Sequence, residues 1–152
     1  MNAPTWLQSL AGPTWRGNSG LWMDPTQPGY TSETKATVRL VAKGIAAAIE
    51  YNWAFEGEPH EGILVVGAND DGEAHASWID SFHMDGSFMV SKGQTGAGDS
   101  LSVLGSYAAP EGPDWGWRTE IEKLSDTAWR VRMYNIPPDS EELLGFELNL
   151  SA

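Results

Sequence analysis

The chain has 152 residues, no cysteine and a formal net charge of −12, from 9 basic and 21 acidic residues. Its length fits one domain over residues 1–152, and the lack of cysteine excludes disulfides and thiolate metal sites. The acidic residues are scattered, so they predict a solubilising surface, and their charge argues against a nucleic-acid partner.

The N-terminus predicts a short helix ahead of the main fold. Pro4 or Thr5 begins one or two turns, so we expect residues 1–12 to cap a barrel formed by residues 13–152. No basic region followed by an apolar run precedes this helix, so we expect no signal peptide and a cytoplasmic location. No stretch approaches the ~20 apolar residues of a spanning helix, so we expect no membrane partner.

From about residue 31 onward, short segments of alternating apolar and polar residues are separated by Gly, Pro, Asn and Asp. Between Ile45 and Phe55 every second residue is apolar, as in a half-buried strand. A sheet of about ten strands usually curls up, and closure removes its edges. We therefore predict an all-β fold, a single closed antiparallel meander barrel. The expected strands lie near 14–23, 32–42, 45–56, 60–69, 74–83, 87–92, 100–107, 115–124, 128–136 and 142–150.

A hairpin is predicted around Asp71-Gly72, a pair that favours a two-residue type I′ turn. Centring the hairpin there places His60 opposite His83 and Val65 opposite Trp78. Two histidines with acidic neighbours could ligate a metal, but polar side chains at strand ends are usually solvated. We therefore expect these histidines to be surface residues and predict no metal site.

The same register turns one acid toward the barrel interior. Trp78 and Phe82 flank Asp80 in alternation, so an inward Trp78 brings Asp80 inward as well. A buried carboxylate must pair, face water or shift its pKa. Two interpretations of Asp80 stay open. Either it forms a structural hydrogen bond to a neighbouring strand side chain or a loop amide, or it contacts a ligand or acts as an acid or base.

A second hairpin is predicted around Ser125. Its charged residues and its apolar residues independently indicate the same strand register. Glu122 faces Arg130 and Glu120 faces Arg132, and a slip of one residue would destroy both charge pairs. The opposite, inner face then carries Trp117, Thr119, Ile121, Trp129, Val131 and Met133.

Eight tryptophans are distributed along these strands. A barrel of about ten strands is wider than the eight-stranded kind that side chains just fill, so we expect an internal cavity. Large flat side chains could instead fill the interior completely, and that alternative stays open. The residues expected to face a ligand are Tyr51, Trp53, Trp78, Asp80, Phe82, Trp117, Thr119, Met133 and Asn135.

Three short motifs carry a resemblance to a known family: Leu10-Ala11-Gly12, Trp15-Arg16-Gly17 and Trp78-Ile79-Asp80. A Leu-containing turn, then Gly, Trp and Gly leading into a first strand, is similar to the lipocalin-like bacterial barrels grouped as domain of unknown function 1579. The resemblance implies a calycin-type antiparallel barrel with a central cavity, and it implies no activity. The chain more distantly resembles the nitrobindins, which hold haem through a histidine near the C-terminus, whereas the last histidine here is His83.

The leading hypothesis is a binding module without a cofactor, which holds a small apolar or aromatic molecule in the barrel cavity. The first alternative is a nitrobindin-like enzyme that depends on haem or on acid/base chemistry. Its axial ligand would be His60, His75 or His83, and its proton-transfer group would be Asp80.

The second alternative is a structural or partner-binding barrel with a solid interior. In the predicted register Leu64, Val66 and Ile79 form an apolar outer face. Such a face could support a homodimer.

Overall fold

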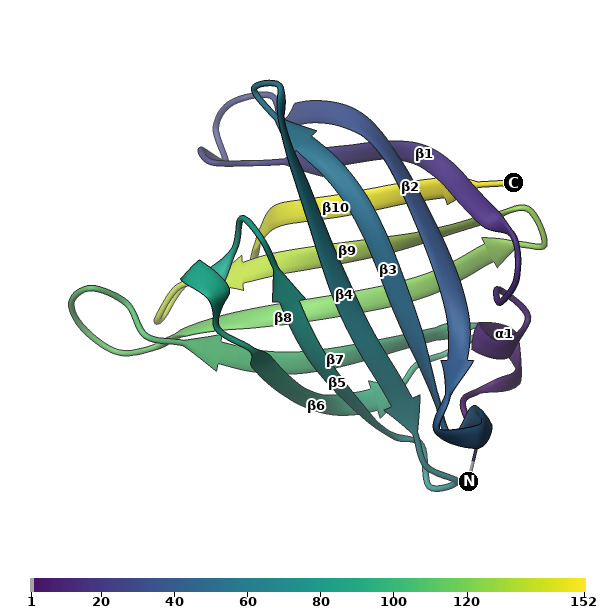
Figure 1. Ribbon diagram of the computed structural model, residues 1–152. Helices are drawn as coiled ribbons and strands as arrows, with labels where there is room; N and C mark the ends of the chain where they lie inside the picture. Colours follow the sequence, from purple (N-terminus) through teal and green to yellow (C-terminus); the bar gives the residue numbers. More distant parts are fainter. Residues whose placement is uncertain (1) are drawn as a thin grey trace.

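A closed antiparallel barrel, described by the computed structural model over residues 2–152, confirms the predicted fold class (Figure 1). The strands follow one another round the barrel in chain order, and β1 closes the ring against β10. They are β1 (Thr14–Leu21), β2 (Tyr30–Val41), β3 (Ala46–Phe55), β4 (Glu58–Ala68), β5 (Glu73–Asp80), β6 (Met89–Thr95), β7 (Ser100–Tyr107), β8 (Trp115–Ser125), β9 (Ala128–Ile136) and β10 (Leu143–Ser151).

The helix α1 (Thr5–Gln8) lies at one end of the barrel, and the turn between β5 and β6 lies at the other (Figure 1). Two short 3-10 turns complete the structure, η1 (Ala42–Gly44) after β2 and η2 (Met84–Gly86) before β6. Within residues 2–152, no helix has the length and apolar character needed to cross a membrane.

The end of the barrel beneath α1 is packed solid. Leu7 on the helix and Leu10 just after it are both buried, and Trp15 donates its indole N–H to the Leu10 carbonyl at 2.9 Å. Trp15 meets Trp129 edge to face, with ring centroids 6.1 Å apart. Aromatic pairs in this geometry add stability beyond the area they bury. This end of the barrel is therefore a hydrophobic core.

The register predicted for the hairpin of β8 and β9 is confirmed. Glu122 lies opposite Arg130, and their side chains form an ion pair at 2.8 Å. Glu120 lies opposite Arg132, although Arg132 forms its ion pair with Glu147 on β10. The side chains predicted for the inner face are all buried.

The register predicted for the hairpin of β4 and β5 is wrong by one residue. Leu64, not Val65, lies opposite Trp78. A type I′ turn needs two central residues with positive φ, but Gly72 has φ +83° while Asp71 keeps a negative φ. The loop therefore has three residues, 70–72, and closes with the Asn69 amide donating to the Glu73 carbonyl at 2.9 Å.

The corrected register also overturns the predicted apolar outer face. Leu64 and Val66 point into the core, with exposed fractions of 2% and 0%. Ile79, Ile63 and Val65 occupy the outer face and are half-buried. The surface predicted to support a homodimer therefore does not exist in the form expected.

Candidate functional site

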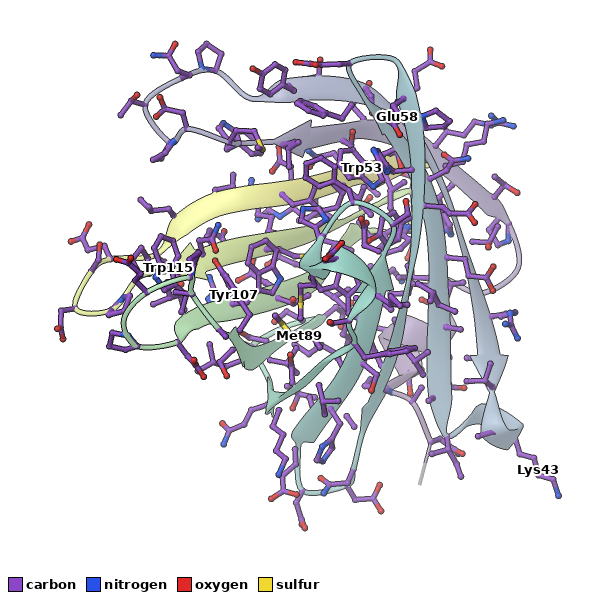
Figure 2. All side chains as sticks on the ribbon, turned by 60° about the vertical axis from the view of Figure 1, so that its left-hand side comes forward. Lys43, Trp53, Glu58, Met89, Tyr107 and Trp115 are labelled. Atoms are coloured by element: carbon purple, nitrogen blue, oxygen red, sulfur yellow. The ribbon has the colours of Figure 1, made fainter. Side chains whose placement is uncertain are left out.

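A cavity of about 450 Å³ opens at the end of the barrel opposite α1. In Figure 2, Met89 and Tyr107 lie at this mouth, whereas Lys43 lies far from it, beyond the end of β2. The cavity walls come from several strands and from the segment after β5, and they include Trp78, Phe82, His83, Met89, Tyr107, Trp117 and Asn135. Aromatic rings and methionines dominate this surface.

Trp78 and Trp117 form a flat, stacked part of the wall. Their ring centroids are 5.6 Å apart and their planes differ by 9°. Trp78 donates its indole N–H to the Tyr51 hydroxyl at 2.8 Å. The indole N–H of Trp117 is buried and has no hydrogen-bond partner among residues 2–152. A buried donor without a partner is uncommon in proteins and calls for an explanation.

Asp80 lies directly behind this wall, and its carboxylate is completely buried. Oδ2 accepts the Tyr51 hydroxyl at 2.6 Å and the Trp53 indole N–H at 3.2 Å. Oδ1 accepts the backbone amides of Phe82 at 2.8 Å and His83 at 3.2 Å. Both structural partners considered from the sequence, a neighbouring strand side chain and loop amides, are present.

Gly62 makes the bond between Tyr51 and Asp80 possible. In the sheet, Gly62 on β4 lies between Tyr51 on β3 and Asp80 on β5. A Cβ at this position would lie 2.5 Å from Tyr51 Cζ and 3.0 Å from Asp80 Oδ2. Only glycine leaves room for the tyrosine ring to cross the intervening strand and reach the carboxylate.

The network fixes the charge states of both groups. Burial alone would raise the pKa of Asp80, but the adjacent His83 ring, the Tyr51 hydroxyl and the Phe82 amide outweigh it, so this pKa falls below its usual 3.8. Burial, together with the negative charge of Asp80, raises the pKa of Tyr51 well above 10.0. At neutral pH the site therefore holds a carboxylate and a neutral phenol.

His83 differs from its prediction as a solvated surface residue, because its side chain is only 12% exposed. Nδ1 lies 3.1 Å from Asp80 Oδ1, without the geometry of a hydrogen bond. Aromatic rings surround the imidazole, among them Trp78 at 5.2 Å and Phe146 at 5.1 Å between centroids. The strand β5 ends at Asp80, so the chain turns His83 into the mouth.

The other two histidines lie elsewhere. His60 is half-buried, and its Nδ1 lies 3.0 Å from the Ser81 hydroxyl. His75 is exposed on the outer face of β5, opposite Lys92 on β6. Within residues 2–152, no three side chains among His, Asp and Glu gather in a way that would hold a metal ion.

The structure places the residues predicted to face a ligand at three depths. Four line the cavity: Trp78, Phe82, Trp117 and Asn135. Behind that wall lie Tyr51, Trp53 and Asp80, linked through the carboxylate. Two are buried in the interior and do not line the cavity: Thr119 and Met133.

Several residues of the wall were not among those predicted to face a ligand, including Met89, Tyr107 and His83, of which His83 was named only as an axial-ligand candidate. The alternation of β7, with Leu101 and Val103 buried, places Tyr107 on the inner face and was a usable signal. Its hydroxyl donates to Asn135 Oδ1 across the mouth. The position of His83 follows from the turn after β5, for which the sequence offered no periodic pattern.

A comparison with protein families finds one match over nearly the whole chain. The family model, described as "Protein of unknown function (DUF1579)", matches residues 2–150. This match confirms the resemblance predicted from the three short motifs. A comparison with curated proteins gives no match.

Proposed function

We propose that this chain, which belongs to the DUF1579 family, binds one small apolar or aromatic molecule in the cavity at the barrel mouth. The observation that carries this proposal is an aromatic-walled cavity of about 450 Å³ in a barrel whose other end is solid. Concave, mainly apolar cavities of roughly 300–1,000 Å³ are typical of small-molecule sites.

The composition of the wall favours a flat guest. Trp78 and Trp117 present a rigid aromatic surface, and offset stacking on such a surface adds to the free energy gained by burying area. Met84 and Met89 contribute flexible side chains that adapt to different shapes. These properties support binding of a small aromatic molecule rather than of a sugar or a nucleotide.

A variant that fills the cavity tests the proposal. A Cβ at Gly145 would lie 3.4 Å from both Trp117 and Asn135, in ordinary contact, so Gly145→Val should place its methyl groups in the cavity. We expect naphthalene to change the tryptophan fluorescence of the wild type, and Gly145→Val to weaken this binding at least tenfold.

The matched control is Gly67→Val, because Gly67 lies on the outer surface of β4 and a Cβ there would be 3.5 Å from the Ile45 carbonyl. This control should bind naphthalene like the wild type. A wild type that binds none of a panel of flat aromatic and lipid molecules would refute the proposal, as would equal affinities for the two valine variants.

A second candidate function is haem binding, and the position of His83 favours it. His83 lines the cavity and has a carboxylate 3.1 Å from Nδ1, and metal-bound histidines commonly have a carboxylate beside the nitrogen that does not bind the metal. Added haem should then give a Soret absorbance band that His83→Phe abolishes and His75→Gln leaves unchanged. A band that survives His83→Phe would exclude His83 as the axial ligand.

A further inference from the structure

The imidazole of His83 presents one free polar edge to the cavity. Nδ1 is buried beside the Asp80 carboxylate, 3.1 Å away. The ring nevertheless lines the cavity and keeps 12% of its side-chain surface exposed. No hydrogen bond to Nε2 occurs among residues 2–152, and Nε2 is not covered, so this nitrogen is open to the cavity that the ring lines.

Asp80 decides which nitrogen carries the proton. The negative charge of the ionised carboxylate, 3.1 Å from Nδ1, favours a proton on that nitrogen even though its N–H is not aligned for a hydrogen bond. In the neutral ring Nε2 is then an acceptor. The other groups packed against this ring are aromatic, namely Trp53, Trp78, Phe82, Trp117 and Phe146.

Trp117 lies beside His83 in the same cavity wall. Trp117 is 94% buried and its indole N–H lacks an acceptor among the described residues. The centroids of the His83 and Trp117 rings are 5.9 Å apart. Because the Trp117 nitrogen is covered, a ligand in the cavity contacts the carbon atoms of this ring and not its N–H.

The charge around the mouth selects against an acid. Asp85 lines the cavity and is exposed, and the whole chain carries −12. A ligand carboxylate would meet this negative field, and it would offer no proton to Nε2 at neutral pH. A neutral hydroxyl meets neither difficulty.

We infer that the ligand is a neutral aromatic molecule with a hydroxyl group, which donates its proton to His83 Nε2. This inference rests on the proposed function and names the ligand class for the same cavity. His83 is the specificity-determining residue, and Asp80 is a positioning residue that acts through it.

Calorimetric titration with three matched probes tests this inference: naphthalene, 2-naphthol and 2-naphthoate. We expect the wild type to bind 2-naphthol about tenfold more tightly than naphthalene, the effect of one well-placed hydrogen bond. We expect 2-naphthoate to bind no more tightly than naphthalene. His83→Phe should remove the advantage of 2-naphthol over naphthalene, whereas the control His75→Gln, on the outer face, should preserve both that advantage and the affinity for naphthalene.

The outcomes separate the two proposals. If naphthalene and 2-naphthol bind equally, or if the advantage survives His83→Phe, the inference fails while the binding function stands. Tightest binding of 2-naphthoate also overturns it. If no probe binds, the proposed function fails and the inference fails with it.

A spectroscopic measurement on the wild type does not depend on the folding of a variant. In ¹⁵N-labelled protein, we expect the Nε2 resonance of His83 to move when 2-naphthol is added and to stay unchanged with naphthalene. Equal movement with both probes, or none with 2-naphthol, would contradict the hydrogen bond.

Discussion

Asp80 illustrates how a single buried charge is held in this barrel. Four donors from Tyr51, Trp53, Phe82 and His83 surround its two oxygens. Leaving such a carboxylate without partners would destabilise the fold by several kcal/mol. The network therefore both stabilises the native state and fixes the orientation of the rings that form the cavity wall.

Replacing Gly62 tests whether the hydrogen bond between Tyr51 and Asp80 requires the absence of a side chain at position 62. Gly62→Ala should push the Tyr51 ring away from the carboxylate and destabilise the protein by about 2 kcal/mol. Gly67→Ala on the same strand is the control, because its Cβ meets only ordinary contacts, at 3.5 Å or more. Urea unfolding measures both, and equal midpoints for the two variants would contradict this role of Gly62.

The lowered pKa of Asp80 predicts how stability changes in acid. A carboxyl whose folded pKa lies below its unfolded value of 3.8 contributes stability that is complete above that value and is lost as the pH falls through the folded pKa. The difference in unfolding free energy between wild type and Asp80→Asn should therefore be constant from pH 7 to 5 and shrink below about pH 4. A difference that stays constant down to pH 2.5 would contradict this assignment.

The sequence identified Asp80 as an unusual acid that points inward, but it did not predict the groups around the carboxylate. Asp80 stood out because it alternates with Trp78 and Phe82. Its contact with Tyr51 depends on the alignment of three strands at Gly62, and one of those registers was predicted wrongly. His83 lies beyond the end of β5, where strand periodicity no longer says which way a side chain points.

The hairpins show when the register of two paired strands can be predicted from the sequence. The hairpin of β8 and β9 was predictable because charge pairs and apolar pairs select the same register. The turn after β3 is a two-residue turn with positive φ at Glu56 and Gly57. The turn after β4 instead uses the Asn69 side chain, whose Oδ1 accepts the amides of Asp71 and Glu73. That side-chain capping favours a three-residue loop and shifts the register by one.

The pair β6 and β7 is the weakest part of the barrel wall. Their pairing covers only Lys92–Thr95 with Leu101–Leu104, so both strands separate toward the mouth. Residues 89–91 pair only with β5, so amides there that face β7 have no cross-strand partner, and such amides exchange with solvent through small local openings. We expect faster hydrogen exchange for residues 89–91 than for residues 92–95, and slower exchange for residues 89–91 when naphthalene is bound. Uniform protection along β6 would contradict the separation of the strands.

At the scale of the whole molecule, the barrel divides into a solid end and a hollow end. The closed meander and the capping helix were predictable, because turn signals and period-two patterns recur along the chain. The position of the cavity could not be predicted, because tryptophans in similar alternating patterns occur at both ends of the barrel. Trp15 and Trp129 fill the solid end, whereas Trp78 and Trp117 line the cavity.

The indole N–H resonances of the tryptophans can therefore show directly whether ligands bind at the barrel mouth. In a two-dimensional ¹H–¹⁵N spectrum recorded during titration with 2-naphthol, the signals of Trp78 and Trp117 should shift with a common dissociation constant. The signals of Trp15 and Trp129, at the solid end, should stay in place. Shifts at Trp15 and Trp129, or no shift at Trp78 and Trp117 at saturating probe, would contradict a binding cavity at the barrel mouth.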